Sequence, residues 1–427
     1  MPGLVLVAFV SALAMSAALP PAKAASAREA ARRDGAYVLV IDPGHGGENN
    51  GAIYELDRRE FVEKEMNLVV ALAMKEELEK YDGINVYLTR EDSDTDISLR
   101  ERAAIAADLD ADFLISLHFN MSERQLFFGS ETWVSAFDTF YANGHALAQL
   151  QQAAMREMGL FDRGIKTRLN DRDDDYYGII RESRRVGINA VLIEFCHLDN
   201  AVDWPFYSID DGQWAAFGRA SATAAAQYFR LRSDILWRDF SDFAVPEVAV
   251  PTDIVRADLT PPDLCRLELL ELDEETRLAL FGIEAIDYDS QLLYYGFSLD
   301  GGEEIEALQL WPDGDALTVS VNLPPERDLQ VTVAVFNSYD RMSLSNVIDI
   351  AALPPDPPPQ TEAIVLAVDE AEIVTVSLAE LTEELADGGA GTDGWPEMYR
   401  FFMVAGLALT LLVAVTWTAR QLNRECR

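Results

Sequence analysis

Two histidines and two glutamates between positions 45 and 194 have the side-chain types that metal-assisted hydrolysis needs. His45 lies in the sequence Ile-Asp-Pro-Gly-His-Gly-Gly, and His118 lies in Ile-Ser-Leu-His-Phe-Asn. Glu65 lies near the start of an expected helix, and Glu194 closes the apolar run at 190–193. Two imidazoles and one carboxylate can bind zinc with one coordination position open, where a water has a pKa of about 7. With a fourth carboxylate to move protons, such a group could carry out hydrolysis.

The segments around these residues indicate how the four side chains could meet. His118 and Glu194 each follow a short apolar run that is typical of a buried strand. In open α/β sheets, binding sites form beyond the carboxyl ends of the strands, so side chains at strand ends can converge there. The glycines that flank His45 let the loop adopt positive φ and let a ligand approach the backbone. Taken alone, each residue also has an ordinary explanation; Glu65, for example, could simply interact with the helix dipole.

Strand-like and helix-like segments alternate between residues 36 and 230. Apolar runs at 37–41 and 113–117 predict buried strands. Apolar residues that recur near a period of 3.6 predict a helix over 65–81. This alternation predicts an α/β fold, with an open mixed sheet flanked by helices on both faces.

The motifs of this region resemble the zinc-dependent N-acetylmuramoyl-L-alanine amidases of the amidase-3 type. They occur in the family's order and extend over residues 37–230 only. The matching segments are Asp42–Gly47 with Gly51 and Ala52, Lys64–Leu68, Tyr87–Arg90, Leu99 and Arg100 with Arg102, Ser116–Asn120, Gly129–Glu131, and Val191–Glu194 with Asn200. One departure is Cys196, which stands where the family usually has glycine.

The resemblance implies that His45, Glu65 and His118 bind Zn²⁺ and that Glu194 is the catalytic carboxylate. Glu194 would take a proton from the attacking water and pass it to the leaving amine. The implied substrate is peptidoglycan, cleaved at the amide between N-acetylmuramic acid and L-alanine of the stem peptide.

A basic stretch over residues 163–185 is unusual in this acidic chain. Its basic residues are Arg163, Lys166, Arg168, Arg172, Arg181, Arg184 and Arg185. Their side chains could contact the carboxylates of stem peptides, or they could pair with neighbouring acidic residues. The sequence leaves both interpretations open.

The pattern changes after residue 230. Residues 231–261 contain prolines and are expected to form a linker. Over 262–350, apolar residues alternate with a period of two and turn signals separate the runs, which predicts a small β-sandwich-like module, hereafter the β-module. Residues 351–398 are rich in proline and acidic side chains and are expected to form an extended spacer.

Both ends of the chain carry segments that indicate a membrane. Residues 1–24 hold a short apolar run followed by an Ala-x-Ala motif, which predicts a secretory signal peptide. Residues 399–418 include an uncharged run that is long enough for one transmembrane helix. Arginines in 419–427 predict a cytoplasmic tail by the positive-inside rule. We therefore expect a single-pass cell-membrane protein whose catalytic domain is extracellular.

The overall charge narrows the range of partners. The formal net charge is −39, from 73 acidic against 34 basic residues. This balance argues against nucleic acid as a partner, because a surface that binds phosphates needs clustered lysine and arginine. With three cysteines and no Cys-x-x-Cys motif, the chain also lacks the pattern of a disulfide framework.

The sequence therefore predicts a zinc-dependent peptidoglycan amidase that is tethered to the cell membrane. Two alternatives remain: an inactive peptidoglycan-binding or regulatory module, and a zinc carboxypeptidase that acts on stem peptides. The presence of Glu194 beside the three expected ligands favours an enzyme, because a domain that only binds has no need of a fourth residue. The β-module could bind glycan or a protein activator.

Overall fold

The computed structural model describes residues 35–312 and 314–352. The expected signal peptide, transmembrane segment and cytoplasmic tail lie outside these residues, as does nearly all of the expected spacer. Within the two described ranges, no helix combines the length and the apolar character needed to cross a membrane. The expectations for the two ends of the chain stay predictions.

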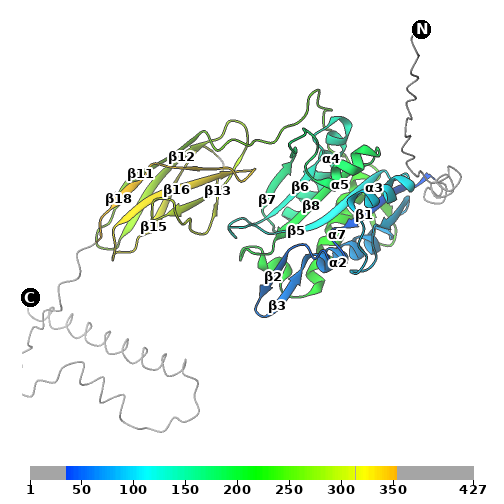
Figure 1. Ribbon diagram of the computed structural model, residues 1–427, viewed down its shortest axis with the longest axis horizontal. Coiled ribbons are helices and arrows are strands. Elements are labelled where there is room, and N and C mark those ends of the chain that lie inside the picture. The colour runs from blue at the N-terminus through cyan, green and yellow to red at the C-terminus, as the bar shows by residue number, and fades with distance from the viewer. Residues whose placement is uncertain (1–34, 313, 353–427) are drawn as a thin grey trace, which may run out of the picture. The chain divides into compact units, whose positions relative to one another are not determined.

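A six-stranded sheet forms the centre of the N-terminal region (Figure 1). Its strands follow the order β4-β1-β5-β8-β6-β7. The first four are parallel, whereas β6 runs antiparallel to β8 and parallel to β7. The strands are β1 (Tyr37–Pro43), β4 (Ile84–Leu88), β5 (Phe113–Asn120), β6 (Ser130–Val134), β7 (Asp162–Lys166) and β8 (Asn189–His197). This arrangement confirms the predicted mixed sheet.

Helices cover both faces of this sheet. Side chains of α2, α4 and α7 share a core with one face, and side chains of α3 and α5 share a second core with the other. The helices are α2 (Glu63–Leu78), α3 (Leu99–Asp108), α4 (Asp138–Glu157), α5 (Gly178–Arg185), α6 (Trp204–Tyr207) and α7 (Asp211–Tyr228). The two cores hold the strands rigidly, so the side chains at the strand ends have fixed positions.

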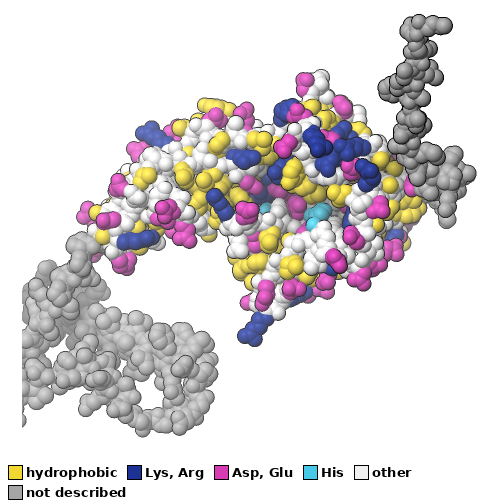
Figure 2. Space-filling model, viewed as in Figure 1, with side chains coloured by type: hydrophobic (Ala, Val, Ile, Leu, Met, Phe, Trp, Pro, Cys, Tyr) yellow, Lys and Arg dark blue, Asp and Glu magenta, His cyan; other side chains and the backbone are white. Residues whose placement is uncertain are grey.

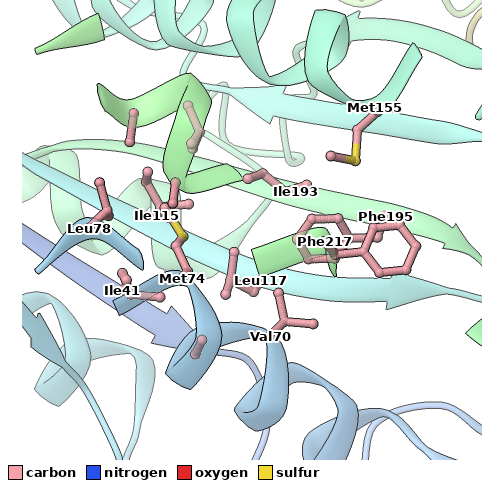
Figure 3. Close-up of a cluster of buried hydrophobic side chains, with 14 of the residues drawn as sticks. Ile41, Val70, Met74, Leu78, Ile115, Leu117, Met155, Ile193, Phe195 and Phe217 are labelled. Carbon is pink, nitrogen blue, oxygen red and sulfur yellow. The ribbon is translucent and has the colours of Figure 1, made fainter. Parts of the chain in front are cut away.

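The larger core shows how the helix periodicity produces this packing (Figure 3). Val70 and Met74 lie one turn apart on α2 and are fully buried. With Phe217 of α7, they pack in the same cluster as Ile115 and Leu117 of β5. Fully burying a side chain of this kind contributes about 1.5–3 kcal/mol.

Two small hairpins were not predicted from the sequence. The first joins β2 (Ile53–Leu56) to β3 (Arg59–Val62) immediately before α2. Its two turn residues have positive φ, as a two-residue hairpin of type I′ requires. The second pairs β9 (Arg232–Ser233) with β10 (Arg238–Asp239), inside the segment expected to be a linker.

The β-module consists of two antiparallel sheets (Figure 1). One sheet has the order β11-β12-β15 and the other β14-β13-β16-β17, with β18 also paired to β16. Phe281 of the first sheet and Phe297 and Val333 of the second lie in one core. The strands are β11 (Leu264–Leu272), β12 (Leu278–Ile286), β13 (Leu292–Ser298), β14 (Gln309–Leu310), β15 (Ala316–Asn322), β16 (Leu329–Asn337), β17 (Met342–Leu344) and β18 (Ile348–Ile350).

Candidate active site

Two histidines and one glutamate from three separate elements meet at one end of the large sheet. His45 follows β1, His118 lies near the end of β5, and Glu63 is the first residue of α2. One possible ligand atom from each side chain lies within 4.8 Å of the others. Glu63 Oε1 is 3.1 Å from His45 Nε2 and 2.9 Å from His118 Nδ1. The histidine side chains visible in Figure 2 lie in a depression of this face of the molecule.

The carboxylate of this group is not the one that the sequence analysis named. Glu65, the predicted ligand, lies outside this group: it is exposed on the first turn of α2, and Glu63 takes its place beside the histidines. Each residue of an α-helix is rotated by about 100° around the axis, so side chains two residues apart lie on nearly opposite sides. Only one of Glu63 and Glu65 can therefore face the histidines. Glu63 shares the buried face of α2 with Asn67 and Val70, which follow it at spacings of four and seven. That spacing was present in the sequence and could have identified Glu63.

Glu63 is held in place by the backbone as well as by the imidazoles. Its Oε2 accepts a hydrogen bond from the backbone N–H of Ala52 at 2.7 Å, and its Oε1 accepts one from Phe119 N–H at 3.2 Å. Burial by itself would raise the pKa of Glu63, but hydrogen bonds from His118 and His45 outweigh it and hold the pKa well below its usual value. The group therefore offers a fixed negative charge between two imidazoles, which suits a divalent cation.

Glycines let the backbone approach this group closely. A Cβ at Gly44 would lie 2.2 Å from Cε1 of His118, and one at Gly51 would lie 2.3 Å from Oε2 of Glu63. His45 itself has a φ of 64°, in the left-handed region that non-glycine residues seldom adopt. Such strain is concentrated at functional sites, where the surrounding structure imposes it.

Further hydrogen bonds orient both imidazoles. His45 Nδ1 is 3.1 Å from Asn49 Oδ1, and His118 Nε2 is 3.3 Å from Ser116 Oγ. Ser116 Oγ in turn donates to Asp42 Oδ2 at 2.8 Å. Outer partners of this kind fix the ring orientation of metal-binding histidines. The two nitrogens and one carboxylate oxygen therefore fit a zinc ion in donor type, spacing and support.

Glu194 lies on the strand next to His118. The two residues are paired in the parallel register of β8 with β5, and Glu194 is also paired with Glu131 in the antiparallel register with β6. Its Oε2 is buried and has no hydrogen-bond partner among the described residues. Burial raises the pKa of Glu194 well above its usual value, the charges of Glu63 and Glu131 raise it further, and Arg163 partly offsets them. An acceptor with these properties can take up and release a proton near the histidines.

Several basic residues of the stretch at 163–185 form ion pairs with acidic residues of the same chain. Arg163 and Lys166 are buried against Glu131, on the side of the site that holds Glu194. Farther along the stretch, the paired residues are Arg184 with Asp174 and Asp175, and Arg185 with Asp174 and Glu182. These four basic side chains are therefore engaged within the chain. Glu131 is a part of the site that sequence analysis noted only as a motif residue.

Comparison with known proteins gives a consistent set of relatives. Residues 39–221 match the family model Amidase_3, described as N-acetylmuramoyl-L-alanine amidase. The chain is 35% identical over 168 residues to the N-acetylmuramoyl-L-alanine amidase LytC of Bacillus subtilis, covering 39% of this chain and 30% of that protein. It is 35% identical over 139 residues to the N-acetylmuramoyl-L-alanine amidase AmiC of Escherichia coli, covering 32% of each. The matches thus span about a third of the length of these curated relatives, 30% and 32%.

Among solved structures, similarity extends to an N-acetylmuramoyl-L-alanine amidase from Clostridium difficile 630. The two chains are 30% identical, with a TM-score of 0.39. The match covers 45% of this chain and 96% of that one. It therefore includes almost all of the clostridial chain and less than half of this one.

Proposed function

Because the chain belongs to the Amidase_3 family through residues 39–221, we propose that it is a zinc-dependent N-acetylmuramoyl-L-alanine amidase. Its substrate in this proposal is peptidoglycan, and the bond it cleaves is the amide between N-acetylmuramic acid and the L-alanine of the stem peptide. We also propose that the enzyme acts outside the cell, held at the membrane by residues 399–418.

One observation carries the enzymatic proposal: the three-residue group of His45, Glu63 and His118 lies one strand away from the buried carboxylate of Glu194. A domain that only bound peptidoglycan would have no use for this fourth side chain. A zinc ion held by the three residues would supply Lewis acidity at the scissile carbonyl and would lower the pKa of water to about 7.

The chain's own residues account for the proton movements. Glu194 accepts the proton that the attacking water loses as its oxygen bonds to the scissile carbon. It then delivers that proton to the nitrogen of L-alanine as the amide bond breaks. The buried Oε2 of Glu194 supports this role, because within residues 35–312 and 314–352 it has no hydrogen-bond partner that must be displaced before the proton is taken up.

The proposed membrane location rests on the sequence. A tether raises the effective concentration of the enzyme at the nearby wall and confines hydrolysis to a zone near the membrane. Digestion of labelled spheroplasts with an external protease tests this location. We expect loss of the catalytic region and retention of a small membrane-bound fragment; protection of the whole chain would contradict the proposal.

The activity is tested with the full-length chain purified in mild detergent. Incubation with purified peptidoglycan should release stem peptides with a free L-alanine amino group and leave unsubstituted muramic acid, as read by mass spectrometry. Chelator should abolish the release and added zinc should restore it. Peptides shortened at the carboxyl end would instead identify a carboxypeptidase, and absence of any product would identify a binding or regulatory module.

One matched pair of variants and a third substitution separate the assigned roles. Glu63→Gln should lose bound zinc and activity, whereas Glu65→Gln, two residues away on the exposed side of α2, should keep both. Glu194→Gln should keep its zinc while kcat falls by about 10²- to 10⁴-fold. Zinc is measured by mass spectrometry of the metal. If Glu65→Gln lost zinc and Glu63→Gln did not, the assignment of the ligand group would be wrong.

A further inference from the structure

A buried cluster of charged side chains lies directly beside Glu194. Glu131 of β6 is paired with Glu194 in the antiparallel register of β6 with β8. Residues directly opposite each other on antiparallel strands carry their side chains on the same face, about 4.5–5.5 Å apart at Cβ. The carboxylate of Glu131 therefore lies directly opposite that of Glu194 on the adjacent strand. The Glu131 side chain is buried, and Glu194 is partly buried with its Oε2 atom enclosed.

Both carboxylate oxygens of Glu131 are occupied by donors. Lys166 Nζ donates to Oε2 at 2.6 Å and Arg163 Nε donates to the same oxygen at 2.8 Å. Trp133 Nε1 donates to Oε1 at 3.0 Å, and Asn120 Nδ2 donates to it at 3.2 Å. Four donors thus fix the orientation of this carboxylate. They keep it from turning toward Oε2 of Glu194, which has no hydrogen-bond partner in the described part of the chain.

Arg163 connects this cluster to the β-module. Its side chain is 1% exposed, and its Nη1 donates to the hydroxyl of Tyr294 at 2.9 Å. Its Nη2 donates to both carboxylate oxygens of Asp340, at 2.8 and 3.0 Å. The guanidinium also lies over the rings of Phe127 and Tyr294, at 5.1 and 5.5 Å from their centroids. Two of the three polar partners of this buried cation, Tyr294 and Asp340, therefore lie far beyond the matched family region.

The charges of the cluster balance only when the β-module contributes. Burial would raise the pKa of Glu131, but the charges of Lys166 and Arg163 outweigh it and hold the pKa low, so this carboxylate is ionised. Burial lowers the pKa of Lys166, and the charge of Glu131 opposes this effect. The two buried basic side chains then face one carboxylate of the N-terminal region, and Asp340 supplies a second negative charge. A buried charge without a partner is strongly unfavourable. Without Asp340, Arg163 would have to reorient toward water and release Glu131.

The β-module presents its two groups on well-supported segments. Asp340 lies in the connection between β16 and β17, where the side chain of Asn337 accepts hydrogen bonds from the N–H groups of Tyr339 and Arg341, each at 3.0 Å. Tyr294 is fully buried in β13, and its hydroxyl donates to the carbonyl of Phe128. Neither group depends on a loose surface side chain for its position.

We propose that the β-module completes the active site, because Asp340 and Tyr294 hold Arg163, and through it Glu131, in the orientation that leaves Glu194 free to accept a proton. The inference rests on the proposed amidase function. Asp340, Tyr294 and Arg163 are positioning residues in this account, since none of them touches the reacting atoms. A released Glu131 carboxylate could approach Glu194 and share with it one proton taken up from solvent. The acceptor that hydrolysis needs would then already be protonated.

The test uses the full-length chain with Asp340→Asn, and separately with Tyr294→Phe, on a soluble muropeptide. We expect kcat to fall by about tenfold in each variant, the lower end of the effects seen for outer partners of active-site groups. KM and bound zinc should stay within about twofold of wild type, because neither substrate contacts nor the ligand group change. Tyr294→Phe keeps the aromatic packing and removes only the hydroxyl. It therefore still tests the proposal if Asp340→Asn does not fold.

Asp349→Asn is the matched control, since it makes the same change on an exposed part of the β-module where Asp349 accepts only from Gln330, at 3.3 Å. Its kcat should equal that of wild type. If Asp340→Asn and Tyr294→Phe lower the unfolding temperature but leave kcat unchanged, the contacts serve only to dock the β-module and the inference is overturned. A wild-type chain without amidase activity would refute the proposed function instead, before any variant is compared.

Discussion

Gly44→Ala should abolish zinc binding although it adds a single methyl group. The new Cβ would lie 2.2, 2.4 and 2.7 Å from Cε1, Nε2 and Nδ1 of His118. Ordinary contacts begin at 3.4 Å, so the imidazole would have to retreat by about 1.2 Å, the difference between 3.4 and 2.2 Å. Metal–ligand distances tolerate deviations of about 0.2 Å. His118 could then no longer share an ion with His45 and Glu63.

The magnitude follows from this displacement. Disturbing only the outer partners of a metal ligand weakens binding by about 10- to 100-fold. Displacing one of three ligands should therefore weaken zinc binding by at least about 100-fold, or about 2.8 kcal/mol. The metal-free chain should lose only about 1–3 kcal/mol of folding stability, the usual cost of overpacking. Zinc should consequently stabilise the wild type much more than the variant.

The assay is a zinc titration against a chromophoric chelator, combined with thermal unfolding with and without zinc. Gly282→Ala is a suitable control, because a Cβ there meets Leu270 at 3.4 Å, an ordinary contact in the β-module. It should bind zinc like the wild type. A zinc affinity of Gly44→Ala within about threefold of wild type would refute the reasoning.

Two further predictions concern the surroundings of the site. Burial raises the pKa of Asp203 to about 6, above its usual 3.8, so its proton-linked contribution to stability is full below pH 4 and is lost as the pH rises through 6. Asparagine cannot ionise, so Asp203→Asn escapes this loss. The free energy of unfolding of Asp203→Asn minus that of wild type, measured with urea, should therefore be about 1–3 kcal/mol larger at pH 8 than at pH 4. An equal difference at the two pH values would contradict this. Arg102→Ala should cost about 3–5 kcal/mol, because it leaves the buried Asp42 carboxylate without its ion-pair partner at 2.6 Å. It also removes one of the two donors to the carbonyl of His45, while Arg90 Nε remains. A loss below about 1 kcal/mol in the same measurement would contradict the importance of the ion pair.

The β-module changes how the proposed enzyme is divided into functional parts. The family match ends at residue 221, which suggests that everything needed for hydrolysis lies before that point. The contacts of Arg163 with Tyr294 and Asp340 argue otherwise, because they connect the two regions through a buried cation. A truncated catalytic region would expose this cation together with the aromatic rings around it.

The sequence by itself predicted the α/β fold with its mixed sheet, and it named His45, His118 and Glu194 as candidate site residues. Alternating apolar runs identify strands and helices because burial follows their local periodicity, and this predicted the mixed sheet. These three residues were named because each lies at the end of an apolar run or in a glycine-rich loop. The structure brings the first two together and places the third one strand away.

The tertiary structure alone decided which faces meet. The spacing of Glu63 with Asn67 and Val70 is visible in the sequence, but only the packing of α2 against the sheet shows that this side of the helix, and not that of Glu65, faces the histidines. The contact of Arg163 with Asp340 joins positions 177 residues apart, and no local pattern encodes such a pairing. Periodicity specifies that a face is buried, but only the complete packing specifies what it is buried against.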